Sequence, residues 1–170
     1  MCIRDRDNDV TLADLAALCD VFYLGGTKMG ALFGEALVIP RMQLQTDFRY
    51  HIKQNGGMLA KGWLLGVQFL TLLEGNRYLA QTSKAVEQAL AIKRACLDKG
   101  YPLYIDSPTN QQFVILPPAH LRQLEKEFVF TRFGETQQGQ PIIRMCTSWA
   151  TREEAVRALI AKIAALPALS

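Results

Sequence analysis

The chain has 170 residues, of which 49% are hydrophobic and 21% are charged, and its formal net charge is +3 at pH 7. This composition is typical of a globular protein, and the length fits one ordinary domain. The positive charges form no basic block with interleaved aromatic residues, and no apolar run reaches membrane-spanning length, so we expect neither a nucleic-acid nor a membrane partner.

The cysteine and histidine spacings indicate neither disulfides nor a metal site. The cysteines lie far apart and form no CxxC pair, and the two histidines, His51 and His120, show no HExxH spacing. We therefore expect reduced thiols, no bound metal and a cytoplasmic location. The charged N-terminus is not typical of a signal peptide.

A short helix is the first element that the sequence predicts. Thr11 is a favourable N-cap residue, Asp14 completes a capping box, and Leu12, Leu15 and Leu18 fall on one face. The helix is therefore expected to end near Leu18.

Two apolar runs bounded by glycines follow the helix. The runs Val21–Leu24 and Glu35–Ile39 predict two short buried strands joined by a tight connection, with Lys28 at its mouth. Most lysines in such a place are simply solvated. Here, however, nearby glycines let another molecule approach the backbone, and a partly desolvated lysine has a lowered pKa and acts as a nucleophilic amine.

Two helices are predicted next, over Gln43–Gln54 and Met58–Leu73, with a Gly-Gly break between them. The second is apolar around most of its circumference, so we expect it to be buried, as in a subunit interface. Two lysines flank the break, Lys53 and Lys61, and composition favours solvated positions for both. Glu74–Asn76 ends the helix and is the expected boundary between domains 1–75 and 76–170.

The second domain is predicted to be α+β with a mostly antiparallel sheet. Its elements are expected at Arg77–Lys99 (helix), Tyr101–Ile105 and Gln112–Leu116 (strands), Ala119–Glu127 (helix), Phe128–Phe133 and Ile142–Thr147 (a hairpin), and Thr151–Leu166 (helix).

Arg144 interrupts the apolar run of the last predicted strand. Strand alternation places Arg144 with Ile142 and Cys146 on one face, opposite Ile143 and Met145. Such an arginine either faces solvent or a structural salt-bridge partner, or grips a carboxylate with its planar guanidinium fork.

Four segments together resemble one family of enzymes. They are DVFYLGGTKMGALFGEALVI (Asp20–Ile39), RYHIKQNGGMLAKGWLLGVQF (Arg49–Phe69), SPTNQQFVIL (Ser107–Leu116) and IIRMCTSWAT (Ile142–Thr151). In this order and spacing they resemble the threonine aldolase and β-eliminating lyase group, pyridoxal-phosphate (PLP) enzymes of the aspartate-aminotransferase fold, type I. The resemblance runs from about Asp7 onward, whereas Met1–Arg6 does not fit and is interpreted as a spurious or truncated start.

The resemblance implies an α/β fold and a partial site. Family members are longer, so the chain is expected to hold the C-terminal remnant of the PLP-binding large domain (1–75), followed by the small α+β domain (76–170). The missing part is expected to supply the aspartate for the pyridine nitrogen, the group stacked on the ring and most phosphate contacts. The chain alone is therefore not expected to form a complete site.

The resemblance also implies roles for individual residues. Lys28, in the GGTK segment, corresponds to the lysine that forms the Schiff base with PLP. Arg144 corresponds to the arginine that binds the substrate α-carboxylate. The resemblance places Lys61 or Lys53 where it would add positive charge near the cofactor phosphate. Thr27, next to Lys28, would either give a phosphate or backbone hydrogen bond or stabilise the turn.

The implied activity is cleavage of threonine or allo-threonine to glycine and an aldehyde by a homodimer or homotetramer. The alternatives are another PLP-dependent β-eliminating lyase, an aminotransferase-like enzyme, or a non-catalytic fragment or oligomerisation domain.

Overall fold

A computed structural model describes residues 10–169, so the N-terminal segment Met1–Arg6 lies outside the described residues. The chain divides into two compact units, Met1–Thr82 and Ser83–Ser170. The division falls within helix α4 (Arg77–Asp98). The domain boundary after residue 75 therefore remains a prediction.

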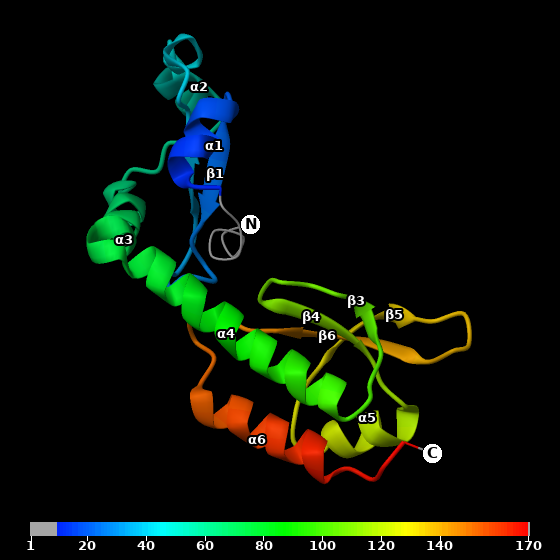
Figure 1. Ribbon diagram of the computed structural model, residues 1–170. Coiled ribbons are helices and arrows are strands. Elements are labelled where there is room, and N and C mark those ends of the chain that lie inside the picture. The colour runs from blue at the N-terminus through cyan, green and yellow to red at the C-terminus, as the bar shows by residue number, and fades with distance from the viewer. Residues whose placement is uncertain (1–9, 170) are drawn as a thin grey trace. The chain divides into compact units, whose positions relative to one another are not determined.

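Unit 1 begins with the predicted helix and strand pair. Helix α1 spans Leu12–Leu18, and strands β1 (Phe22–Gly25) and β2 (Glu35–Val38) form a two-stranded antiparallel sheet (Figure 1). The capping box is present: the Thr11 side chain accepts from the Asp14 amide at 3.1 Å, and the Asp14 carboxylate accepts from the Thr11 amide at 2.7 Å. The Thr11 hydroxyl also donates to the Asp14 carboxylate at 2.6 Å, and this bond together with that from the Thr11 amide lowers the pKa of Asp14.

The next two predicted helices are both shorter than expected. Gln43–Gln54 is not one helix, because Asp47, at φ 54°, separates the 3-10 helix η2 (Met42–Gln45) from α2 (Phe48–Gln54). Helix α3 (Trp63–Leu73) begins five residues later than Met58, since the chain turns at Gly62, whose amide donates to the Leu59 carbonyl at 3.0 Å. The 3-10 helix η3 (Glu74–Asn76) then leads into α4.

The prediction of two buried strands is wrong, because β1 and β2 are only partly buried, whereas the burial of α3 in a subunit interface stays a prediction. Among the described residues, unit 1 buries a small apolar cluster: Leu24, Met29, Ala31, Phe69, Leu72 and Tyr78. The outward side chains of the hairpin, Tyr23 and Leu37, are about half exposed, and Trp63 on α3 is 64% exposed. One hairpin and one helix offer each other a single face, so their other faces stay open.

Unit 2 is an α+β layer with one core. After α4 come strands β3 (Leu103–Ile105), β4 (Gln111–Ile115), β5 (Thr131–Glu135) and β6 (Pro141–Cys146), and helices α5 (Pro118–Leu124) and α6 (Glu153–Ala165). The strands are all antiparallel in the order β3-β4-β6-β5, which confirms the predicted hairpin and sheet. The predicted strand at Phe128 begins three residues later, at Thr131.

Helices α4, α5 and α6 lie on the same side of this sheet (Figure 1). They bury one face of β4 and β6, with core residues drawn from every one of these elements: Ile92, Cys96, Val114, Leu121, Leu124, Ile143, Met145, Val156, Leu159 and Ile163. Burial raises the pKa of the Cys96 thiol to about 12. Within residues 10–169, no helix has both the length and the apolar character needed to cross a membrane.

Candidate functional site

A glycine-built turn joins β1 to β2 and contains Lys28. The Gly26 carbonyl accepts hydrogen bonds from the amides of Met29 at 2.9 Å and Ala31 at 3.0 Å. These two bonds close a compact loop around Thr27 and Lys28. We call residues 26–34 the Lys28 turn.

The Lys28 turn has no room for a side chain at Gly26. A Cβ atom there would lie 2.6 Å from the Ala31 Cβ and 2.8 Å from the Phe69 Cζ. At Gly34, φ is +87° and a Cβ would lie 2.5 Å from Leu65 Cδ2. The glycines predicted to permit close approach therefore let the turn pack against α3.

Side chains from two helices fasten this turn. The Tyr78 hydroxyl donates to the Gly25 carbonyl at 3.1 Å, and the Thr82 hydroxyl donates to the Met29 sulfur at 2.8 Å. The Leu32 amide donates to Gln68 Oε1 on α3 at 2.7 Å. Met29 is fully buried, so the residue after Lys28 acts as an anchor.

Lys28 and Thr27 are both exposed at the tip of this anchored turn. The described residues therefore do not supply the partial desolvation that the sequence argument invoked for the Lys28 amine. What they do supply is a fixed backbone position, because the flanking residues are bound on both sides.

Lys61 and Lys53 lie near a second hollow of unit 1. Lys61 is exposed in the turn before α3, where its carbonyl accepts from the Leu64 amide at 3.0 Å, and Lys53 is exposed in the last turn of α2. A cavity of about 380 Å³ lies between these elements, and the cation that lines it is Arg49 rather than either lysine. Arg49 is not among the site residues predicted from the sequence, although it lies four residues before Lys53 on the same helix.

Arg144 lies in the middle of the sheet of unit 2. It is paired with Phe113 on β4 and with Thr131 on β5, so these three residues share a face. The predicted alternation is confirmed, because Ile143 and Met145 on the opposite face are buried in the core while Arg144 is half-buried. Its Nε atom is buried and has no hydrogen-bond partner within the described part of the chain.

A cavity of about 250 Å³ lies beside this strand. Polar residues in its wall include Arg144, Thr131, Cys146 and Thr151, and α6 contributes apolar residues. The cavity therefore combines one guanidinium-bearing residue with hydroxyl and apolar groups.

The end of strand β6 is fixed by Asn110 and Thr147. The Asn110 side chain donates to the Thr147 carbonyl at 2.6 Å, and the Thr147 amide donates to the Asn110 carbonyl at 3.1 Å. The Thr147 hydroxyl donates to the Ala85 carbonyl of α4 at 2.6 Å. These bonds tie the strand to β4 and α4 three residues beyond Arg144.

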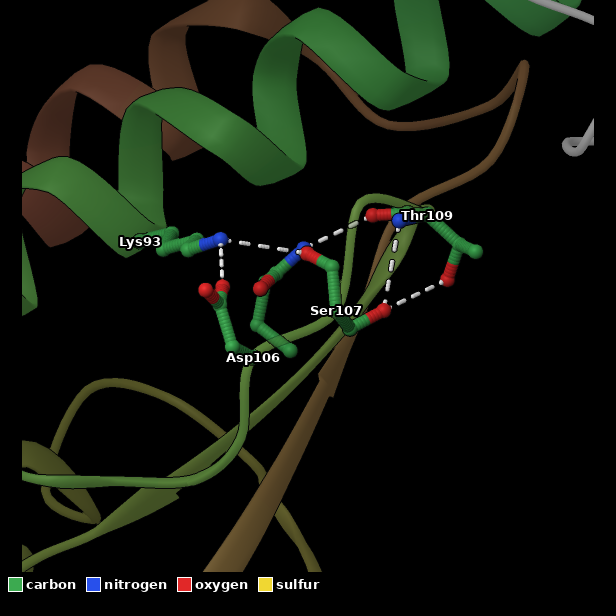
Figure 2. Close-up of polar contacts among 5 residues, drawn as sticks. Lys93, Asp106, Ser107 and Thr109 are labelled. Atoms are coloured by element: carbon green, nitrogen blue, oxygen red, sulfur yellow. Dashed lines mark hydrogen bonds and ion pairs between the residues drawn. The ribbon is translucent and has the colours of Figure 1, made fainter. Parts of the chain in front are cut away.

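The Ser107–Gln112 segment stabilises the start of β4 (Figure 2). Lys93 forms an ion pair with Asp106 and donates to the Ser107 carbonyl at 3.4 Å. The Ser107 hydroxyl bonds the Thr109 hydroxyl at 2.9 Å and accepts from the Thr109 amide at 3.2 Å. This segment is therefore a hydrogen-bonded turn held by α4.

The described chain is thus an α/β protein in which a lysine-bearing turn and an arginine-bearing antiparallel sheet lie in separate units. Among the residues from 10 to 169, no group of three or more His, Cys, Asp or Glu side chains is placed to hold a metal ion. No protein-family model matches the chain.

Two curated proteins similar to this chain are low specificity L-threonine aldolases. The enzyme from a Pseudomonas species is 32% identical over 149 residues, which cover 86% of this chain and 42% of the relative. The enzyme from Pseudomonas aeruginosa is 29% identical over 143 residues, covering 82% of this chain and 40% of the relative. The chain therefore spans about two fifths of the length of the curated relatives it matches.

Solved structures agree with this similarity. A threonine aldolase from Leishmania major is 38% identical and superposes with a TM-score of 0.89 over 94% of this chain and 46% of that structure. An 8-amino-7-oxononanoate synthase from Francisella tularensis shares the fold. It is 15% identical and superposes with a TM-score of 0.53 over 77% of this chain and 41% of that structure. The resemblance to the threonine aldolases is confirmed.

Proposed function

We propose that this chain is the C-terminal part of a PLP-dependent lyase that cleaves threonine or allo-threonine to glycine and an aldehyde. The observation that carries the proposal is the exposed Lys28 on an anchored glycine turn, in a chain similar to three threonine aldolases. The proposal includes a large-domain remnant over residues 1–75 and a small domain over 76–170. It also includes a cytoplasmic location and a homodimer or homotetramer.

The Lys28 turn fits a role in holding PLP. An amine that reacts with a carbonyl group must be accessible and fixed in position. Lys28 is exposed, while a Cβ at Gly26 would meet Ala31 and Phe69, so the backbone under the amine cannot shift freely. When bound, PLP withdraws electrons from the bonds at the substrate α-carbon. Thr27 and Lys61 are proposed to contribute contacts to the phosphate.

Arg144 is proposed to orient the substrate. A guanidinium binds a carboxylate through two parallel hydrogen bonds, which fixes the direction of the remaining substrate bonds. The buried Nε of Arg144 has no partner in the described part of the chain, and none of the ion pairs found there includes this guanidinium. A donor of this kind favours an incoming anion, since an unpartnered buried donor is costly. In this role Arg144 holds the α-carboxylate, and the Thr147 and Asn110 bonds keep its strand in place.

The first test concerns Lys28 itself. A chimera in which this chain replaces the matching part of the Leishmania major enzyme is mixed with equimolar PLP, treated with borohydride and digested, and mass spectrometry locates the lysines that carry the pyridoxyl group. We expect preferential labelling of Lys28 over Lys126, an exposed lysine of unit 2, and no increase at other sites in Lys28→Ala. Equal labelling of both lysines would reject the assignment.

The second test concerns the reaction. A chimera in which this chain replaces the matching part of the Leishmania major enzyme is assayed with threonine, and both possible product sets are measured. Glycine and acetaldehyde are expected, with loss of both in Lys28→Ala and retention in Lys126→Ala. Release of ammonia and a keto acid instead would favour the β-eliminating alternative.

A further inference from the structure

Helices α4 and α6 of unit 2 lie side by side (Figure 1), and a groove of about 420 Å³ runs between them. We call it the α4–α6 groove. Its volume lies within the range of about 300–1,000 Å³ that is typical of small-molecule sites. Ala91 on α4 and Val156 and Ile160 on α6 give it an apolar wall. Neither Lys28 nor Arg144 lines it, so the groove is separate from the residues assigned to the lyase reaction.

A buried polar side chain, Gln88, also lines the groove and is only 8% exposed. Its Nε2 atom donates to the Thr151 carbonyl at 3.2 Å, and because a carbonyl can only accept, this bond decides which end of the amide is the nitrogen. The Oε1 atom is buried and has no hydrogen-bond partner among residues 10–169. A buried acceptor without a donor is costly, so this oxygen favours a ligand that brings an N–H group.

The start of α6 lies next to Gln88. Thr151, which accepts the Gln88 hydrogen bond, comes two residues before Glu153, the first residue of α6. The N-cap residue, Arg152, forms no side-chain hydrogen bond with the amides of the first turn. The start of a helix carries a partial positive charge and favours a carboxylate. An acceptor for an ammonium group and a position that favours a carboxylate are therefore neighbours.

The exposed side chains that line the groove carry both signs of charge. Lys84 and Arg157 are cations, and Glu87 and Glu153 are carboxylates. Arg157 pairs with Glu153 at 3.5 Å, whereas Lys84 forms no ion pair within the described part of the chain. Charges of both signs suit a zwitterion better than a simple anion or cation, because each ionic group of the ligand meets an opposite charge.

We propose that the α4–α6 groove binds a free α-amino acid with an aliphatic side chain. The ammonium group donates to Gln88 Oε1, the carboxylate faces the start of α6 and Lys84, and the aliphatic side chain lies against Val156 and Ile160. One carbon atom separates the two ionic groups of an α-amino acid, which suits an acceptor and a helix start that are neighbours. This inference does not rest on the proposed lyase function, because it involves neither Lys28 nor PLP.

The test uses the full 170-residue chain, isotopically labelled for NMR, with L-valine as the probe. The signals followed are the backbone amides of Glu153 and Glu154 and the side-chain amide of Gln88, and we expect shifts that saturate at millimolar valine. Isovalerate lacks the ammonium group and isobutylamine lacks the carboxylate, so each should bind about tenfold more weakly, the loss typical of one hydrogen bond to a charged group. Lys28→Ala should bind valine like the parent chain, so failure of the lyase function would leave this result unchanged.

A matched pair of variants locates the site. Lys84→Met removes a cation from the groove, and Lys126→Met removes an exposed lysine of unit 2 that lies outside it. We expect Lys84→Met to weaken valine binding about tenfold and Lys126→Met to have no effect. Gln88→Leu should weaken binding by a similar factor. Because Gln88 also holds Thr151, circular dichroism checks the fold of this variant, and the lysine pair decides the outcome if it does not fold.

Three results would overturn the inference. The first is the absence of a saturable shift with valine, which would leave water as the partner of Gln88. The second is binding of isovalerate or isobutylamine as tight as that of valine, which would indicate a simple anion or cation site. The third is equal weakening of valine binding by Lys84→Met and Lys126→Met.

Discussion

The substitution Gly26→Ala tests whether the Lys28 turn is as tightly built as its contacts indicate. The new methyl group would lie 2.6 Å from the Ala31 Cβ, 2.8 Å from the Phe69 Cζ and 3.2 Å from the Gly34 carbonyl oxygen. Only the phenyl ring can tilt away, because a Cβ and a carbonyl are fixed to the backbone. Since overpacking of this kind typically costs about 1–3 kcal/mol, we expect a loss of that size in unit 1.

The assay is amide hydrogen exchange measured by NMR, together with urea unfolding. The Met29 and Ala31 amides are the right probes, because both donate to the Gly26 carbonyl. Their exchange should accelerate in Gly26→Ala, and pyridoxyl labelling of Lys28 should fall with it. The double variant Gly26→Ala/Ala31→Gly removes the shortest contact and should recover part of the loss.

Gly66→Ala is the matched control for this prediction. Gly66 lies inside α3, and a Cβ there would meet nothing within 4 Å. Alanine is the better helix former, so this change should stabilise the chain by about 0.5–1 kcal/mol. If Gly26→Ala proves as stable as the parent chain with unchanged amide exchange, the steric argument is refuted.

Three further predictions concern unit 2. Thr147→Val removes the side-chain hydrogen bond to the Ala85 carbonyl and should lower the free energy of unfolding in urea by about 0.5–1.5 kcal/mol, with most of the loss restored in Thr147→Ser. Equal stability of the Val and Ser variants would contradict this. The Cys96 thiol, whose pKa burial raises to about 12 from 9.0, should resist alkylation at pH 8 while the exposed Cys146 reacts, as peptide mass spectrometry can show. The Cys96 thiol ionises at a lower pH in the unfolded chain than in the folded chain, so the free energy of unfolding should fall as the pH rises from about 9 to 12. If the parent chain and Cys96→Ala show the same dependence of stability on pH, this linkage is disproved. In the chimera, Arg144→Lys should raise KM for threonine about tenfold to a hundredfold with a smaller change in kcat. The reason is that lysine keeps the positive charge but cannot form the two parallel hydrogen bonds of a guanidinium. An unchanged KM would show that Arg144 does not bind the substrate carboxylate.

Local signals in the sequence were sufficient wherever neighbouring residues decide the conformation. The Thr11 and Asp14 capping box fixes the start of α1, since both partners lie within one helical turn. Gly100, at φ 86°, ends the long helix as a C′ glycine. Alternation along β6 correctly separated the face of Arg144 from the buried Ile143.

Tertiary contacts decided the features that such signals do not encode. The left-handed Asp47 divides a run that reads as one helix, and Trp63 starts α3 only after a turn stabilised at Gly62. The anchoring of the Lys28 turn depends on Tyr78 and Thr82, each 53 residues from the group it contacts. No periodicity links positions so far apart.

The burial of helix α3 shows most clearly what the sequence decides and what the tertiary structure decides. The sequence of α3 determines that two of its faces carry apolar side chains, because hydrophobicity belongs to the side chains themselves. Which face is covered depends on the neighbours: Phe69 packs under the Lys28 turn, while Trp63 and Leu70 remain exposed. The sequence by itself thus determined most of the elements, the placement of Lys28 in the turn after β1 and of Arg144 on β6, and the likeness to threonine aldolases. The tertiary structure alone decided how the Lys28 turn is held and which face of α3 is covered, because both depend on contacts between residues distant along the chain.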